Sequence, residues 1–258
     1  DRLCLRDDRF LRGQPVQEGH RHLPAGRLTG DATVCGRYFL HSTADRLRSL
    51  FGEMPMPVLE ARYNIAPTQP VPVVRQNPAG RREMVLVRWG LIPSWSKGPD
   101  SRFSMINARV ETVARKPAYR TAFRYRRCLV PVDGFYEWRA TDGGKQPYLL
   151  RPRDGSPMAL AGLWEHWQDA DGNELESCTI LVREADAQVR AVHERMPVIM
   201  TPDSFDLWLD IHAQKPQPLE TLLAVQQPPE LEVYPVSRAV NSPRADKAEL
   251  LERIEVQP

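Results

Sequence analysis

The sequence predicts an α+β fold, a single domain in which short helices flank a strand-rich, β-barrel-like core. Three observations predict it. A chain of 258 residues is long enough for one large domain with a substantial hydrophobic core. Its 24 prolines favour short strands and rigid loops over long helices. Short apolar runs alternate with turn residues, and neither a repeat period nor a linker divides the chain.

The strands are predicted from runs of β-branched and aromatic residues bounded by glycine, proline or aspartate. The turn pairs Gly143-Gly144 and Asp171-Gly172 indicate hairpins between neighbouring strands. The expected strand segments are 37–40, 62–75, 83–92, 127–132, 134–138, 148–151, 158–164 and 178–182. A polar loop through 96–101 is expected after the segment 83–92.

The helices are predicted from apolar spacing together with end signals. Ser42 is the expected N-cap of a helix over 43–52, which Gly52 would end. The pair Thr201-Pro202 suits a capped helix start for 202–210. Further helices are expected over 109–115, 184–194 and 245–254.

Residues 1–34 differ from the rest of the chain. They mix arginines with acidic residues, lack the apolar segment of a secretory signal, and show poor hydrophobic periodicity. Two explanations compete: a disordered basic arm, or upstream DNA translated from a misplaced start. We expect the second, and in either case we expect the folded domain to be 35–258. GTG is one of the codons for valine, and it also serves as a bacterial start codon that is read as methionine. The misplaced-start explanation therefore places the true start at Val34.

Composition limits the classes of partner. The formal net charge is only +2, so a nucleic-acid site must be a local basic patch. No apolar run approaches membrane-spanning length. The four cysteines show neither metal-site spacing nor the density of a secreted disulfide framework, so we expect no metal and no cofactor. We expect a monomeric protein of the reducing cytoplasm, associated with the nucleoid when bound to DNA.

Cys35 acquires a distinctive chemistry if translation begins at Val34 and the initiator methionine is removed. Its amine and thiol would then sit on adjacent carbons. Such a 1,2-aminothiol condenses with an aldehyde to an imine, and the thiol closes a five-membered thiazolidine. Both groups keep a usable nucleophilic fraction at neutral pH. An internal Cys35 has an amide nitrogen and would be an ordinary buried cysteine.

Seven motifs follow one another along the chain, and together they carry a family resemblance. They are CGRY at 35–38, RYNIAPTQ at 62–69, RWGLIPSW at 88–95, INAR at 106–109, RRCLVPVDGFYEW at 126–138, AGLWE at 161–165 and HERMPVI at 193–199. Their order and approximate spacing resemble the SOS-response-associated peptidase (SRAP) family over nearly all of 35–258.

The resemblance implies a single domain with a β-barrel-like core that binds single-stranded DNA. It also implies that the N-terminal cysteine cross-links to abasic sites as a thiazolidine and shields the lesion during the replication-associated damage response. In that family the cysteine follows the initiator methionine directly, which supports Val34 as the start. A preference for junctions between single and double strands is implied as well.

Three residues besides Cys35 are candidates for catalysis. Glu137 lies between aromatic residues that would raise its pKa, so we expect it to shuttle protons beside the Cys35 amine. His193 has a near-neutral ordinary pKa and could protonate a sugar oxygen as the ring opens. Asn107 can donate and accept, and would hold the opened sugar or orient the Cys35 backbone. The alternatives are a solvated carboxylate, a structural histidine and a turn-capping asparagine.

The expected DNA contacts are arginines, lysines and tryptophans near these positions. Arg37 and Arg109 are the leading phosphate binders, because each lies within two residues of a candidate catalytic residue. A basic run that either extends the phosphate track or forms a solvated face comprises Lys116, Arg120, Arg124, Arg126 and Arg127.

Trp89, Trp95 and Trp138 are candidates for stacking on bases, with at least one expected to be packing only. The loop that contains Asn64, Ala66 and Pro67 would border the site. Where the family often has small hydroxyl residues, this chain has Val182-Arg183, so Arg183 would replace a hydroxyl contact with a charged one.

Three functions remain open at this stage. The first is covalent capture of abasic sites in single-stranded DNA through Cys35, with DNA lyase-type activity in addition. The second is a cysteine peptidase with Cys35, His193 and Glu137 as nucleophile, base and orienting group, acting on other proteins or only on its own upstream segment. The third is a noncovalent DNA- or protein-binding module with an inert cysteine.

Overall fold

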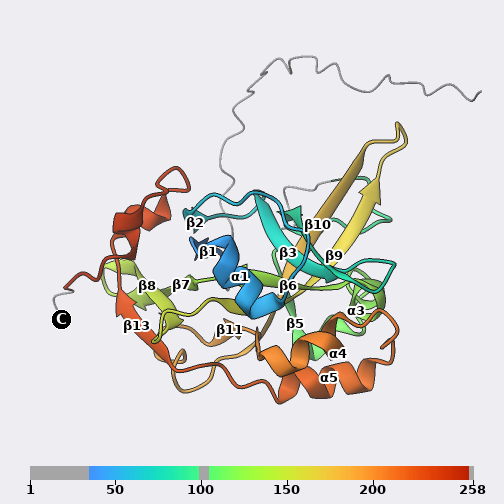
Figure 1. Cartoon of the computed structure of the whole chain (residues 1–258). Helices are drawn as coiled ribbons and strands as arrows, with labels where there is room; N and C mark the ends of the chain where they lie inside the picture. Colours follow the sequence, from blue (N-terminus) through green and yellow to red (C-terminus); the bar gives the residue numbers. More distant parts are fainter. Residues whose placement is uncertain (1–34, 99–104, 256–258) are drawn as a thin grey trace, which may run out of the picture. The chain divides into compact units, whose positions relative to one another are not determined.

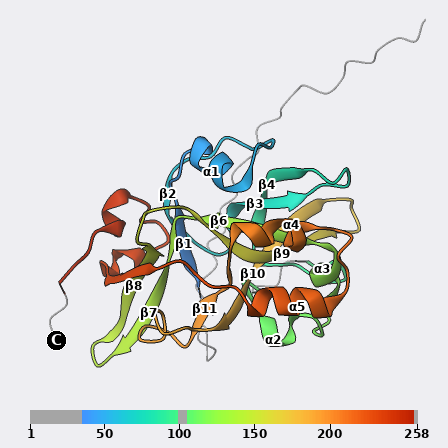
Figure 2. The same ribbon diagram turned by 60° about the horizontal axis from the view of Figure 1, so that its bottom comes forward.

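Two β-sheets that share one main hydrophobic core make up the folded part of the chain. The structure, a computed structural model, describes residues 35–98 and 105–255, and the statements below concern this part. The sheets have five and eight strands, and short helices lie beside them (Figures 1 and 2). The predicted α+β class with a strand-rich core is confirmed.

Five strands of the larger sheet close into a barrel. Their order around the ring is β10, β4, β3, β6, β9 and back to β10. The pairing of β10 with β4 is parallel and the other four pairings are antiparallel. The bounds are β3 (Pro70–Gln76), β4 (Arg82–Trp89), β6 (Arg127–Val132), β9 (Met158–Gln168) and β10 (Glu174–Glu184).

Three short strands extend the larger sheet beyond the barrel. The strand β5 (Asn107–Arg109) runs parallel to β10, and β11 (Arg195–Pro197) pairs with the end of β10. The third, β12 (Ile199–Met200), pairs with β9. The segments that carry the INAR and HERMPVI motifs therefore meet on one strand, β10.

The smaller sheet is antiparallel throughout, in the order β13-β8-β7-β1-β2. Its bounds are β1 (Arg37–Leu40), β2 (Arg62–Ile65), β7 (Gly134–Thr141), β8 (Gly144–Pro152) and β13 (Leu231–Pro235). Strand β1 lies between β2 and β7, which brings the motifs CGRY, RYNIAPTQ and DGFYEW side by side.

Alternation along the strands gives the smaller sheet two apolar faces. Tyr38 and Phe135 belong to the main core, which also contains the barrel residues. Phe39 and Tyr136 belong to a second cluster with Val240 and other residues of the C-terminal segment. Because successive side chains point to opposite faces, Glu137 shares the face of Phe135 and is buried on the main-core side.

The helices are short, as the proline content indicates. They are α1 (Ala44–Phe51), α2 (Val110–Val113), α3 (Arg120–Tyr125), α4 (Phe205–Leu209) and α5 (Pro216–Ala224), with 3-10 turns at Pro202–Ser204, Arg238–Asn241 and Ala248–Leu251. No helix in this part of the chain is long and apolar enough to cross a membrane.

Several local predictions are wrong, each for a tertiary or side-chain reason. Residues 185–194 are turns rather than a helix, because the Asp186 carboxylate accepts the backbone N–H groups of Gln188 and Val189 and ends regular structure there. The predicted C-terminal helix is only the 3-10 turn at Ala248–Leu251. Thr43, not Ser42, caps α1, since the Ser42 hydroxyl donates to Asp133.

Other elements escaped the sequence reasoning. They are α3, α5, β5, β11, β12 and β13. The predicted strands are present, but 62–75 is divided into β2 and β3, 83–92 ends at Trp89, and the segments 134–138, 148–151, 158–164 and 178–182 lie in longer strands. The hairpin turns at Gly143-Gly144 and Asp171-Gly172 connect β7 to β8 and β9 to β10.

Gly134 begins β7 at a position with no room for a side chain. A Cβ at this position would lie 2.6 Å from both the Leu150 carbonyl oxygen and the Phe39 ring. Gly134→Ala should therefore lower the free energy of unfolding by about 1–3 kcal/mol through overpacking. Gly143→Ala at the other end of β7 is the matched control, because the nearest atom there is 3.9 Å away. Urea unfolding measures both, and equal stabilities would contradict this packing.

Candidate active site around Cys35 and Glu137

A buried cysteine and a buried glutamate meet directly at the start of β1. The Cys35 backbone nitrogen donates to Glu137 Oε1 at 2.5 Å, and both residues are 0% exposed. The contact follows from the sheet register, since Arg37 pairs with Tyr136 across β1 and β7. Two candidates separated by 102 positions are thus held together by strand pairing.

Burial dominates the electrostatics of this pair. It raises the pKa of Glu137 to about 8, although the N–H groups of Cys35 and Trp138 and the charge of Lys145 oppose the rise. Burial also raises the pKa of the Cys35 thiol well above its ordinary value, and the nearby Glu137 carboxylate adds to the rise. At neutral pH the sulfur is therefore a thiol rather than a thiolate.

The backbone at Cys35 is unusual. Its φ is +44°, in the left-handed region that non-glycine residues rarely occupy, and such a conformation costs on the order of 1–3 kcal/mol. The surrounding packing and the Glu137 contact hold the residue in this conformation. This φ, and any strain it carries, exists only while residue 34 is attached to Cys35.

His193 lies just before β11 and is half-buried. Its Nδ1 lies 3.0 Å from the Arg195 backbone nitrogen and 3.2 Å from the Arg195 carbonyl oxygen, so the tautomer decides whether Nδ1 accepts or donates. Burial lowers the pKa of His193, and the charge of Lys145 lowers it further, so the ring is neutral at pH 7. Lys145 also lowers the pKa of Glu137, so one charge acts on both candidates.

Asn107 and Arg109 lie on β5, which runs beside β10. The Asn107 carbonyl oxygen accepts the Tyr119 hydroxyl at 3.3 Å, and its side chain is half-buried. Arg109 is exposed at the beginning of α2. These positions agree with an anchoring role for Asn107 and with a surface role for Arg109, which both stay predictions.

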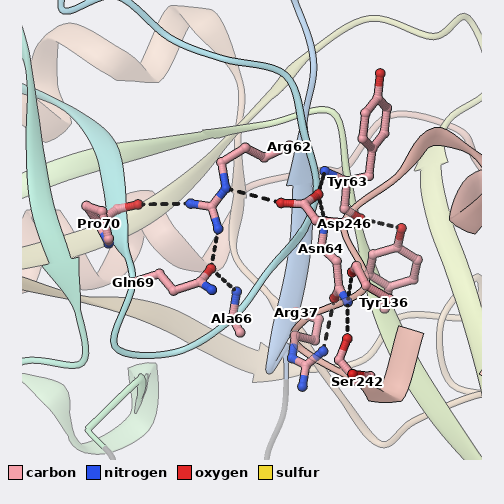
Figure 3. A network of polar contacts seen from close by, with 11 residues as sticks. Arg37, Arg62, Tyr63, Asn64, Ala66, Gln69, Pro70, Tyr136, Ser242 and Asp246 are labelled. Carbon is pink, nitrogen blue, oxygen red and sulfur yellow. Dashed lines mark hydrogen bonds and ion pairs between the residues drawn. The ribbon is translucent and has the colours of Figure 1, made fainter. Parts of the chain in front are cut away.

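Arg37 is not the open phosphate-binding fork that the sequence suggested. Its Nη1 donates to Asn64 Oδ1 at 3.0 Å and to the Val240 carbonyl at 2.7 Å. Its Nη2 donates to the Asn241 carbonyl at 3.3 Å. Figure 3 shows the guanidinium turned toward Asn64 and Ser242. Nε and part of Nη2 remain for a phosphate, so the phosphate contact expected of Arg37 stays a prediction.

The tryptophans separate into three environments. Trp89 is 0% exposed and its Nε1 donates to the Ile106 carbonyl, so it cannot stack on a base and that prediction is wrong. Trp138 is half-buried beside Glu137, with Nε1 donating to Asn241 Oδ1 at 2.8 Å. Trp95 is 68% exposed, the most open of the three.

The residues of the basic run differ in exposure. Lys116, Arg120 and Arg124 are exposed. Arg127 is 4% exposed and donates to backbone carbonyls, among them that of Trp208 at 2.6 Å, while burial lowers its pKa to about 10. Arg126 pairs with Glu165 at 2.7 Å. Arg127 therefore belongs neither to a phosphate track nor to a solvated face, the two alternatives left open for this run, while the role of the half-buried Arg126 stays a prediction.

Arg183 is half-buried, and its Nη1 donates to the Gln226 carbonyl at 2.8 Å. It lines an open cavity of about 610 Å³ with Glu111, Glu184 and Asp186. Because acidic side chains share that cavity, the position of Arg183 gives little support to the DNA contact expected for it.

Sequence reasoning missed three polar residues near the site. Lys145 acts electrostatically on Glu137 and His193 from the neighbouring strand β8. Asn241 and Asp246 reach the site region from the C-terminal segment. Nothing in the local sequence indicates these roles, because each depends on a pairing across more than one hundred residues or between adjacent strands. No group of three metal-ligating side chains occurs within 35–98 and 105–255.

The fold and the site define a class of protein: a strand-rich α+β domain with a buried Cys–Glu pair at the beginning of its first strand. The family model described as SOS response associated peptidase (SRAP) matches residues 34–243. The abasic site processing protein YoaM of Bacillus subtilis is 36% identical over 223 residues, covering 85% of this chain and 98% of that protein. The chain therefore belongs to the SRAP family.

Other relatives and solved structures agree. The abasic site processing protein HMCES of Gallus gallus is 32% identical and covers 86% of this chain and 79% of its own length. YedK of Escherichia coli is 27% identical over 86% of this chain and 100% of its own. A crystal structure of a Bacteroides thetaiotaomicron protein superposes with a TM-score of 0.74 at 23% identity, covering 86% of this chain and all of that one, which supports the fold.

The raised pKa of Glu137 predicts a pH-dependent stability for the chain in which residue 34 is still attached. Its folded pKa, about 8, exceeds the ordinary pKa of glutamate, so the folded protein binds the proton more tightly than the unfolded chain. Stability from this group is fully present below about pH 4, and falls as the pH rises toward 8. Glu137→Gln should flatten this decline, as measured by urea unfolding at pH 5 to 8. An unchanged slope would contradict the buried, protonated carboxyl.

Proposed function

We propose that this protein processes abasic sites in single-stranded DNA by forming a covalent thiazolidine cross-link through a free N-terminal Cys35. The observation that carries the proposal is the 2.5 Å contact between the Cys35 backbone nitrogen and the Glu137 carboxyl group. A carboxyl group at that place can exchange protons with an amine nucleophile, whereas a buried peptide N–H needs only a hydrogen-bond acceptor. The printed names of relatives such as YoaM and HMCES, abasic site processing proteins, support the substrate class.

The first step is attack by the amine. The Cys35 nitrogen adds to the aldehyde carbon of the ring-opened sugar and gives a carbinolamine. Glu137 accepts a proton from the nitrogen and returns one to the departing hydroxyl, so that water leaves and an imine forms. A pKa of about 8 suits a group that must both accept and donate near neutral pH.

The second step closes the ring. The Cys35 sulfur adds to the imine carbon, forming the carbon–sulfur bond, and the thiol proton ends on the nitrogen. One water is released over the whole sequence, and no oxidant, metal or cofactor is consumed. Because burial keeps the sulfur protonated, ring closure depends on proton transfer to the imine nitrogen, for which Glu137 is adjacent.

The chemistry requires that residue 35 carry no upstream peptide bond in the active protein. The family match begins at residue 34, and YoaM is covered to 98% of its length by 85% of this chain. Both observations support an active form that begins at Cys35, whether translation starts at Val34 or a longer chain is cut. Mass spectrometry of the N-terminus of protein isolated from the native cell tests this directly.

His193 and Asn107 are proposed to handle the sugar. In the tautomer whose Nδ1 accepts the Arg195 N–H, neutral His193 carries its hydrogen on Nε2 and can donate it to a sugar oxygen while the closed hemiacetal opens. Asn107 supplies an amide that can both donate and accept. The exposed residues Arg109, Lys116 and Arg120 are proposed to contact the phosphates, with Trp138 and Trp95 available to stack on bases.

A second candidate is cleavage of the chain's own bond before Cys35, which the word peptidase in the family's description favours. The product of that cleavage would be the free amine. General proteolysis is less well supported, because a cysteine peptidase needs a sulfur with a depressed pKa, whereas burial raises the pKa of Cys35.

The test uses an oligonucleotide with one abasic site and denaturing electrophoresis. Protein beginning at Cys35 should give a heat-stable adduct, and mass spectrometry should find it lighter by one water than the sum of its components. Cys35→Ser and a form with residues 1–34 attached should give none. Cys128→Ser is the matched control, since that buried cysteine lies in the core of the barrel. An adduct from Cys35→Ser would overturn the thiazolidine, and peptide cleavage without any adduct would select the peptidase.

Arg109→Ala should weaken binding to single-stranded DNA of any sequence and reduce the slope of log affinity against log salt by about 0.7. Arg81→Ala is the matched control, because it removes the same charge from an exposed position between β3 and β4. Fluorescence anisotropy at several salt concentrations measures both slopes. Equal slopes in the two variants would remove Arg109 from the phosphate contacts.

A further inference from the structure

The C-terminal segment 237–246 is tied to the strands that carry the site by a network of polar contacts (Figure 3). Asn64 on β2 is 0% exposed, and its Nδ2 donates to the carbonyls of Ser242 at 2.9 Å and Ala245 at 2.7 Å. The same nitrogen also lies 3.2 Å from the Val240 carbonyl. The buried Asn64 side chain thus holds the segment 237–246, which pairs with no strand of either sheet.

Asp246 closes the network from the other side. Its Oδ1 accepts the backbone N–H groups of Tyr63 at 2.5 Å and Asn64 at 3.1 Å, and its Oδ2 pairs with Arg62 at 3.5 Å. Figure 3 shows Asp246 between Arg62 and these two backbone groups. The free edge of β2 is therefore covered by a side chain of the C-terminal segment rather than by another strand.

Asn241 links this segment to both flanks of the Cys35–Glu137 pair. Its carbonyl accepts Arg37 Nη2, two residues after Cys35. Its side-chain Oδ1 accepts Trp138 Nε1, one residue after Glu137. Asn241 is itself exposed, and its side chain contributes to no core. Neither contact touches the reacting sulfur or carboxyl group, but each fixes a side chain beside one of them.

We propose that Asn241 is a positioning residue for the DNA side of the active site, holding the Trp138 indole on the face of β7 opposite to the buried Glu137 side chain, with Asn64 and Asp246 as the clamp that keeps Asn241 in place. The proposal rests on the proposed function and deepens it. An indole pinned through its N–H presents a fixed face to a base beside the abasic site, whereas a free one loses that orientation. The bases adjacent to the lesion are the ligand, in agreement with stacking as the general mode of single-strand recognition.

The experiment compares Asn241→Ala with Ser242→Ala. Ser242 is the matched control, because it is exposed, lies next in the chain and contributes only its backbone carbonyl to the network. Asn241→Ala should slow cross-linking to an abasic single-stranded oligonucleotide and weaken its noncovalent binding by about two- to tenfold, the usual effect of one hydrogen bond. Ser242→Ala should match the unsubstituted protein in both. The reaction of Cys35 with glyoxylate, a small aldehyde without bases, should be equal in all three.

A double-mutant cycle decides whether Asn241 acts through Trp138. Trp138→Phe keeps an aromatic face and removes the N–H, so Asn241→Ala should add little to its effect on the cross-linking rate. If the double variant reduces the cross-linking rate by the product of the two single reductions, Asn241 does not act through Trp138. Asp246→Ala should act in the same direction as Asn241→Ala, and thermal unfolding shows whether it still folds.

Three results would overturn the proposal. The first is a cross-linking rate for Asn241→Ala equal to that of Ser242→Ala. The second is a slowing of the Asn241→Ala reaction with glyoxylate as large as that with the oligonucleotide, and the third is a double variant whose rate reduction equals the product of the two single reductions. A failure of the proposed function is distinguishable from these results. In that case the unsubstituted protein forms no adduct with either aldehyde, while noncovalent binding of the oligonucleotide by the variants still tests the role of Asn241.

Discussion

One hydrogen bond, from the Cys35 backbone nitrogen to the Glu137 carboxyl group, depends on the pairing of strands that lie far apart in the sequence. It exists because β1 pairs with β7 and because alternation turns Glu137 toward the main core. The carboxyl group is buried, and burial raises the pKa of Glu137 to about 8. An apolar residue there would leave the buried Cys35 N–H without an acceptor, so the acid also serves the structure.

The two faces of the smaller sheet hold different groups of the candidate site. The face that meets the barrel carries Cys35 and Glu137, which are sealed from solvent in the described chain. The opposite face carries the C-terminal segment, through which Arg37 and Trp138 are fixed. The proposed reaction with a sugar would use both: a desolvated acid to move protons, and rigid side chains on which the DNA is held.

Membership of the SRAP family fits this division. Relatives from bacteria and from Gallus gallus share about one third of their residues with this chain over most of its length. Arg183, near the end of β10, donates to the Gln226 carbonyl and lines a cavity that contains both acidic and basic side chains. The DNA contact expected for it stays a prediction.

The amino-acid sequence by itself determined the fold class, most strands and the principal candidates, because strand alternation, turn pairs and motif order are local properties. It also singled out Cys35 and Glu137 as partners, from the chemistry of an aminothiol and a carboxyl group between aromatic residues. The tertiary structure alone decided which charged and aromatic residues face solvent. Trp89 and Arg127 look like DNA contacts in the sequence, yet both are buried and engaged by backbone carbonyls. Asn241 and Asp246 carry no local signal at all, because their partners lie on β1, β2 and β7, and only folding brings those strands within hydrogen-bond distance.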